Sequence, residues 1–314
     1  MPSFSYVIVL KLKGWRLLVM IDLMNKLRKY GVRWGLSSFA QIEYKSVTVN
    51  RLFTCVSAEH GACVLKIGYN TKHMENEYHV FHDYRGTRFC QVYEVDLAQG
   101  VLLLERIIPG IQLRDEPDLD QRLELFYDVF DGLHVKPADK TIYPTYMGWV
   151  SRITKYMRGR NDYEILTSKM IQAEHICCEL WRKYPDEFLL HGDLHHDNIL
   201  LDEDNCSRII DPKGVIGDRA FDIPRFIVNE FGDTFDYDFD VKFRHIVRFF
   251  SDKLDVPEQD ILRLVYVEIC MGECWHVEDG REVKMDHVDF VEKMISDKSK
   301  SLETTSLSEI SVKI

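Results

Sequence analysis

The chain has 314 residues, of which 46% are hydrophobic, so it can bury a large core, and a disordered or fibrous protein is excluded. Its 51 acidic and 40 basic side chains give a formal charge of −11, which argues against a nucleic-acid partner and favours a cationic ligand. Eight cysteines lack CxxC or zinc-ligand spacing, so they are interpreted as reduced thiols of a cytoplasmic protein.

Residues 1–37 are interpreted as an N-terminal extension. Its apolar runs at 6–10 and 15–21 are too short to span a bilayer and are interrupted by basic residues, so no membrane partner is predicted. Apolar side chains then recur at helical spacing: Leu23, Leu27, Tyr30 and Trp34. This helix follows Met20, and residues 1–19 are therefore expected to lie outside the folded core.

Residues 38–110 are predicted to form an N-terminal lobe made mostly of strands. The strand-like segments are 46–49, 52–57, 62–68, 90–95 and 101–108, and one helix-like segment, 72–84, lies among them. This order suits a small antiparallel sheet that carries one helix. Pro109-Gly110 marks the predicted boundary, because the periodicity changes after it.

Residues 111–296 are predicted to form a larger, mainly helical lobe. Apolar residues recur at helical spacing in five segments: 119–133, 163–180, 241–254, 259–274 and 287–295. Three short apolar runs, 188–190, 199–201 and 208–210, lie in the middle of this region. The fold class is therefore α+β, and residues 297–314 are expected to be a flexible tail, because they show no sustained apolar period.

A dense polar segment, His191 to Asn198, lies between two of the short apolar runs, where a loop is a good position for an active site. A hairpin centred near Asn205 would place Ile199 opposite Asp211 and bring Asn198 beside Asp211. Phosphoryl transfer needs a carboxylate for the attacking hydroxyl and hard oxygen ligands for magnesium. Asp193 is the candidate base, and Asn198 with Asp211 are the candidate Mg²⁺ ligands.

A second candidate group lies in the strand-rich region. Strand alternation turns Lys66 away from the side of Cys63, Leu65 and Ile67, so it should face a partner or a ligand. Glu77 on the predicted helix could hold this lysine against nucleotide phosphates, and Glu75 is the competing carboxylate.

The strings HGDLHHDNIL and IDPKGVIGDRAFD resemble the aminoglycoside O-phosphotransferases, and are most similar to their streptomycin 6-kinase and hydroxyurea-resistance branch. The similarity extends through residues 77–86 and 100–110, and covers roughly Ser46 to Gly280. It implies a protein-kinase-like fold of two lobes, with nucleotide binding in the first lobe and catalysis in the second. The implied cofactors are ATP and Mg²⁺, with GTP as the alternative nucleotide.

The resemblance also implies roles for single residues. Lys66 would contact the phosphates, and the backbone of the hinge from Glu105 to Ile107 would bind adenine. Asp222 would accept hydrogen bonds from the catalytic-loop backbone. His191 is interpreted as a packed scaffold residue, because the adjacent Asp193 already has the proton-accepting role.

The predicted substrate is a cationic small molecule of the aminoglycoside type, with a streptomycin-like compound favoured by the branch resemblance. Carboxylates after the catalytic loop would replace the water around such a polycation. Asp236 and Glu273 are the preferred candidates among these carboxylates.

Three alternatives stay open. The first is a kinase of another small hydroxylated metabolite. The second is a metal-dependent phosphohydrolase, whose metal ligands would come from six clustered side chains: His191, Asp193, His195, His196, Asp197 and Asn198. The third is a non-catalytic pseudokinase, suggested by the absence of glycine between Leu36 and His60, where kinases place a glycine-rich phosphate loop.

Overall fold

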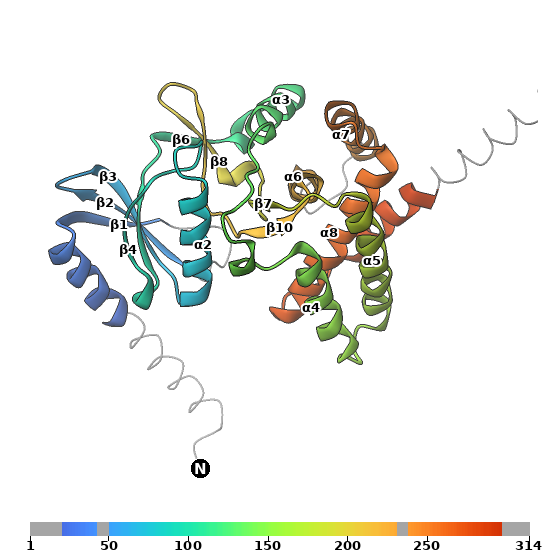
Figure 1. The fold of residues 1–314 in the computed structure, drawn as a ribbon, viewed down its shortest axis with the longest axis horizontal. Helices are drawn as coiled ribbons and strands as arrows, with labels where there is room; N and C mark the ends of the chain where they lie inside the picture. Colours follow the sequence, from blue (N-terminus) through green and yellow to red (C-terminus); the bar gives the residue numbers. More distant parts are fainter. Residues whose placement is uncertain (1–20, 43–49, 231–237, 297–314) are drawn as a thin grey trace, which may run out of the picture. The chain divides into compact units, whose positions relative to one another are not determined.

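The structure is a computed structural model that describes residues 21–42, 50–230 and 238–296 (Figure 1). The expectations for residues 1–19, for the strand at 46–49 and for the tail at 297–314 lie outside this range. The chain divides into two compact units. The first comprises the described residues up to Tyr78 together with Cys90–Ile107, and the second comprises His79–Phe89 together with the described residues from Ile108 onward.

The first unit is built on a five-stranded antiparallel sheet with the strand order β1-β2-β3-β5-β4. Its strands are β1 Leu36–Gln41, β2 Arg51–Ser57, β3 Gly61–Ile67, β4 Val92–Asp96 and β5 Val101–Glu105. The last four confirm predicted strands. The sequence did not predict β1, because LSSFAQ mixes small and polar side chains without a clear alternation.

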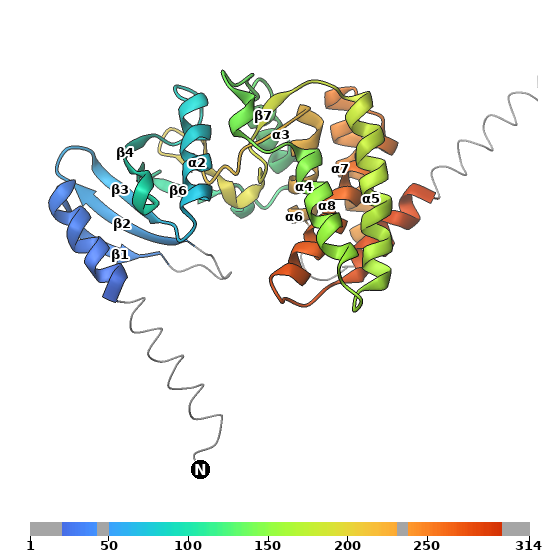
Figure 2. The ribbon, with the colours of Figure 1, turned by 60° about the horizontal axis from the view of Figure 1, so that its bottom comes forward.

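Alternation along β3 builds the core of this unit. Cys63 and Leu65 are fully buried and pack with Leu27 and Tyr30 from a helical segment at residues 21–33. Figure 2 shows this helix, in dark blue, beside β1 and β2. Helix α2, Thr71–Asp83, follows β3 and confirms the predicted helix of this region.

The second unit is mainly helical. Its helices are α3 Leu119–Phe130, α4 Tyr146–Arg158, α5 Glu164–Lys183, α6 Ile223–Glu230, α7 Phe239–Leu254, α8 Glu258–Glu278 and a segment at residues 285–296. Helix α8 packs against α4, α5, α6 and α7, and α4, α5 and α8 lie side by side in Figure 2. The predicted helices at α3, α5, α7 and α8 are confirmed, whereas the sequence did not predict α4 or α6.

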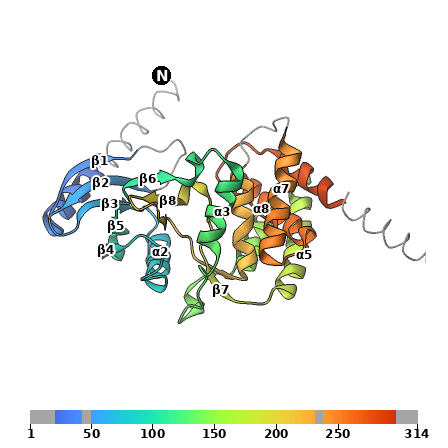
Figure 3. The same ribbon diagram turned by 90° about the horizontal axis from the view of Figure 1, so that it is seen from above.

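Two small sheets lie within the second unit. One has the order β6-β8-β9, with β6 Pro109–Gln112, β8 Ile199–Asp202 and β9 Ser207–Ile209. The other pairs β7 Phe188–Leu190 with β10 Val215–Gly217. Figure 3 shows β6 beside β8. The polar segment from His191 to Asn198 connects β7 to β8, and it therefore links the two sheets.

The β8–β9 hairpin is present, but its predicted register was wrong. Ile199 pairs with Ile209 and not with Asp211. The turn sets this register, because the Asp202 side chain accepts hydrogen bonds from the Asp204 and Cys206 amides. Asn205 takes the left-handed conformation, with φ of 56°. The centre of the hairpin consequently lies one residue earlier than predicted.

The described elements confirm the α+β class, with an antiparallel sheet in the first unit and helices dominating the second. None of the helices in the described ranges combines the length and the apolar character that a bilayer-spanning helix needs.

Candidate active site

The loop between β7 and β8 is fastened to a buried carboxylate. Asp222 accepts hydrogen bonds from the backbone amides of His191 and Gly192, each at 2.8 Å. Gly192 has a φ of 77°, and a Cβ there would lie 2.9 Å from the Trp149 ring, so glycine fits both the turn and the space. Two bonds to adjacent amides fix the direction in which the chain enters the loop at Asp193.

Asp222 is only 1% exposed, and its charge is balanced locally. His134 Nε2 lies 3.1 Å from Oδ2 and donates a third hydrogen bond. Burial alone would raise the pKa of Asp222, but the hydrogen bonds from His134 and from the Gly192 amide hold that pKa below its usual value. The carboxylate is therefore ionised and accepts all three bonds.

His191 lies inside the fold. Its Nε2 is 2.9 Å from the Ile210 carbonyl oxygen, and its Nδ1 accepts a hydrogen bond from the Asp193 amide at 3.1 Å. These partners assign the proton to Nε2. Burial lowers the pKa of His191, so the ring is neutral at physiological pH. The contacts agree with the scaffold interpretation of this histidine.

Asp193 projects from this loop and is 22% exposed on its side chain. Arg225 Nε lies 3.4 Å from Oδ1, Lys213 Nζ lies 3.8 Å from Oδ2, and His195 Nε2 lies 3.8 Å from Oδ1. Burial would raise the pKa of Asp193, but Arg225, then Lys213 and His195, hold it below its usual value. Asp193 is thus an ionised acceptor of protons and hydrogen bonds across the physiological pH range.

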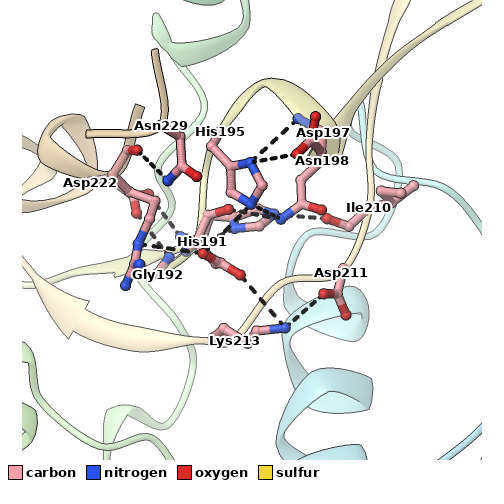
Figure 4. A network of polar contacts seen from close by, with 12 residues as sticks. His191, Gly192, His195, Asp197, Asn198, Ile210, Asp211, Lys213, Asp222 and Asn229 are labelled. Carbon is pink, nitrogen blue, oxygen red and sulfur yellow. Dashed lines mark hydrogen bonds and ion pairs between the residues drawn. The ribbon is translucent and has the colours of Figure 1, made fainter. Parts of the chain in front are cut away.

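Asn198 and Asp211 lie at the open end of the β8–β9 hairpin (Figure 4). The Ile210 amide donates to the Asn198 carbonyl at 3.0 Å, which ties the two ends of the hairpin together. Asn198 Nδ2 donates to the Asp193 carbonyl at 2.9 Å, so the side-chain amide is oriented by the loop itself. Asp211 has a left-handed backbone, with φ of 56°, which turns the chain directly after the hairpin.

The side chains at the open end of the hairpin carry oxygen ligands that fit a small divalent cation. Asp211 offers a carboxylate and Asn198 an amide oxygen, and magnesium prefers such hard oxygen ligands. Within the part of the chain that the structure describes, no three His, Cys, Asp or Glu side chains are grouped to hold a metal ion. His196 is directed to Glu230 and His191 to the Ile210 carbonyl, so two of the side chains considered as transition-metal ligands already have partners inside the fold.

Lys66 and Glu77 form an ion pair within the first unit. The distance from Nζ to Oε1 is 2.7 Å, and the side chains are only 4% and 6% exposed. The competing Glu75 on the same helix is exposed. Lys66 on β3 and Glu77 on α2, which were predicted as a pair, are therefore in direct contact.

Replacing Lys66 with methionine should lower the free energy of unfolding by about 3–5 kcal/mol, because the buried Glu77 charge loses its partner. The double variant Lys66→Met/Glu77→Met should recover most of this loss, since neither charge remains buried. Urea denaturation of the wild type, both single variants and the double variant measures the coupling between the two residues. Equal stability of Lys66→Met and the wild type would contradict the buried pair.

The segment proposed as a hinge follows β5. The Glu105 amide donates to the Gln91 carbonyl at 2.8 Å, and its carboxylate accepts from the Gln91 amide at 2.9 Å. Ile107 is 8% exposed, and it is the last residue of the first unit. Both ends of this segment are thus held in place by backbone contacts or by burial.

The structure describes one of the two acidic residues that were predicted to contact the substrate. Asp236 lies outside the described residues. Glu273 is 7% exposed, and its Oε2 accepts from the Lys284 amide at 2.8 Å and contacts His276 Nδ1 at 3.2 Å. These contacts anchor the chain after α8, so the Glu273 carboxylate is already used within the fold.

The sequence missed a set of residues around Asp193. Arg225 Nη2 contacts Glu268 Oε1 at 2.6 Å, and Tyr146 donates to Glu268 Oε2 at 2.6 Å. The guanidinium carbon of Arg225 lies 5.5 Å from the centre of the Trp275 ring. Burial would lower the pKa of Arg225, but Glu268 and Asp193 raise it. Arg225 is consequently a fixed cation beside the Asp193 carboxylate.

Comparison with known proteins gives a family and a fold. Residues 33–280 match the family of aminoglycoside/hydroxyurea antibiotic resistance kinases. No match was found among curated proteins. Three solved structures illustrate the similarity of fold, each at 12–14% identity.

The first is the choline kinase LicA from Streptococcus pneumoniae, with a TM-score of 0.63, covering 88% of this chain and 99% of that one. The second is a thermostable mutant of the aminoglycoside phosphotransferase APH(4)-Ia in complex with AMP-PNP and hygromycin B, with a TM-score of 0.61 and coverages of 87% and 96%. The third is the spectinomycin phosphotransferase APH(9)-Ia with ADP and spectinomycin, with a TM-score of 0.54 and coverages of 87% and 93%. The likeness confirms the protein-kinase-like fold.

Proposed function

Because the chain belongs to the aminoglycoside/hydroxyurea antibiotic resistance kinase family, it is a small-molecule kinase with an alcohol acceptor, and we propose that it transfers the γ-phosphate of ATP to a cationic, aminoglycoside-type compound. The observation that carries the proposal is the ionised Asp193 carboxylate, held on a loop that Asp222 anchors and followed by the hairpin bearing Asn198 and Asp211. GTP is the alternative nucleotide.

In this proposal each residue has one task. Asp193 orients the acceptor hydroxyl and takes its proton as the oxygen attacks phosphorus. Asn198 and Asp211 would hold Mg²⁺, which screens the phosphate charge when bound. The second unit therefore provides the base and the candidate metal ligands, both placed by the catalytic loop and its hairpin.

The first unit provides the nucleotide contacts in the proposal. Lys66 would bind the phosphates as a point charge, and Glu77 holds its ammonium at 2.7 Å. The backbone between Glu105 and Ile107 would bind the adenine. Support for a nucleotide comes from the APH(4)-Ia mutant structure, which was determined with AMP-PNP. A reaction that consumes ATP is expected in the cytoplasm.

The proposed acceptor is a streptomycin-like polycation. Its support is the formal charge of −11 and the hygromycin B and spectinomycin in two structures of similar fold. Asp236 and other acids of the second unit are the proposed contacts, whereas Glu273 would need to release the Lys284 amide first. A second candidate acceptor, a small amino alcohol, is favoured by the choline kinase and ethanolamine kinase among the similar structures.

Purified protein with ATP and Mg²⁺ should release ADP in the presence of streptomycin or a related aminoglycoside. The apparent affinity for this acceptor should weaken as salt rises from about 50 to 500 mM, because salt screens exposed charge pairs. A panel of aminoglycosides, amino alcohols and neutral sugars measures both points, and neutral acceptors serve as the control for salt. Turnover on a neutral sugar or amino alcohol alone would reject an aminoglycoside as the acceptor, while the assignment as a small-molecule kinase would stand.

A further inference from the structure

Lys213 places a positive charge between the two carboxylates of the proposed reaction. Its Nζ lies 2.7 Å from Asp211 Oδ2 and 3.8 Å from Asp193 Oδ2. Figure 4 shows the contact between Lys213 and Asp211. The side chain of Lys213 is 42% exposed. A ligand at this position could therefore reach the ammonium group.

The backbone around Lys213 is fixed independently of its side chain. The amides of Lys213 and Gly214 both donate to the His191 carbonyl, at 2.8 and 3.1 Å. These bonds tie the chain after Asp211 to the catalytic loop. An exposed lysine in an ion pair adds little to stability. The fold therefore gives no strong reason for a cation at this position.

The two cations beside Asp193 differ in freedom. Arg225 faces Oδ1 and is held by Glu268 and by the Trp275 ring. Lys213 faces Oδ2 through a flexible stem with three donors, and it contacts two carboxylates that are themselves assigned to the reaction. Arg225 is built as a fixed support, whereas the Lys213 ammonium can change partner.

We propose that Lys213 is a catalytic residue that donates hydrogen bonds to the phosphoryl group during its transfer; this rests on the proposed function. When Asp211 serves as a metal ligand, its attraction for the Lys213 ammonium is reduced, and the ammonium can turn to a phosphoryl oxygen near Asp193. The bond from phosphorus to the ADP oxygen breaks, the bond to the acceptor oxygen forms, and the acceptor proton passes to Asp193. Lys213 stays protonated and stabilises the charge on the equatorial oxygens.

The test compares Lys213→Met, which removes the charge at similar length, with Lys213→Arg, which retains a charge. Lys213→Met should lower kcat by about 10²–10³-fold, while the acceptor KM stays within a few-fold. Calorimetry with ATP and Mg²⁺ but without acceptor should give a nucleotide Kd within a few-fold of the wild type. The melting temperature should be unchanged, and Lys213→Arg should recover part of kcat.

Lys253→Met is the matched control, because Lys253 also pairs with a carboxylate at 2.7 Å, Glu124, and has no place in the site. It should retain the kcat of the wild type. The inference is overturned if Lys213→Met keeps kcat within a few-fold, or if it loses nucleotide affinity in proportion to kcat. A wild type without transfer to any acceptor would instead reject the proposed function.

Discussion

The Asp193→Asn variant should lose turnover by about 10²–10⁴-fold, because the asparagine amide can still contact the acceptor hydroxyl but cannot take its proton. The side chain keeps its size, so the fold and the nucleotide affinity should be retained. Steady-state kinetics with the best acceptor of the panel measures kcat, and calorimetry with ATP and Mg²⁺ measures binding.

The matched control is Asp197→Asn in the same loop. Asp197 pairs with Arg114 through both carboxylate oxygens, at 2.5 and 3.0 Å, and has no role in the proposed transfer. This variant should stay within a few-fold of the wild type. Equal losses in the two variants, or turnover of Asp193→Asn within a few-fold of the wild type, would show that the base is assigned wrongly.

The Asp222→Asn variant should be destabilised by about 1–3 kcal/mol, because an amide nitrogen would replace one of the oxygens that accept three buried hydrogen bonds. Turnover should fall with it, since the His191–Gly192 backbone positions Asp193. Urea denaturation and kinetics on the same samples measure both effects. Asp162→Asn, at an exposed pair with Arg160, is the control and should leave the unfolding midpoint nearly unchanged.

This stability difference should depend on pH. The folded protein holds the pKa of Asp222 below its usual value, so the ionised carboxylate contributes stability above the unfolded pKa of about 3.9. That contribution is lost as the pH falls through the folded pKa. The gap between the wild type and Asp222→Asn should therefore shrink as the pH falls below about 4. A constant gap at all pH values would contradict an ionised Asp222.

Local patterns were enough to predict the positions of the candidate site residues that lie on regular elements. Period-two alternation placed Lys66 on the face of β3 opposite Cys63 and Leu65. The predicted helix that became α2 carries Glu77, which was expected to pair with Lys66. The hairpin followed from two short apolar runs around a polar turn. Its register did not, because the pairing depends on the Asp202 side chain and the left-handed Asn205, which act within the turn.

The environment of Asp193 could not be predicted from periodicity. Arg225 lies in α6, which has eight residues and is too short to show a helical period. Its partner Glu268 lies in α8 among buried residues that are mostly apolar, so the sequence pattern gives no sign of a buried ion pair there. Lys213 stood within the motif quoted for the family resemblance, yet only the distances to Asp211 and Asp193 indicate its role.

Phosphorus NMR of one reaction containing the protein, ATP, Mg²⁺ and the best acceptor of the panel tests the central claim most directly. The account predicts that the γ-phosphate signal of ATP disappears while a phosphomonoester on a hydroxyl of the acceptor appears in equal amount with ADP. Formation of inorganic phosphate alone would indicate a phosphohydrolase, and an unchanged spectrum would indicate a binding protein without turnover. Either result would contradict phosphoryl transfer at the Asp193 loop.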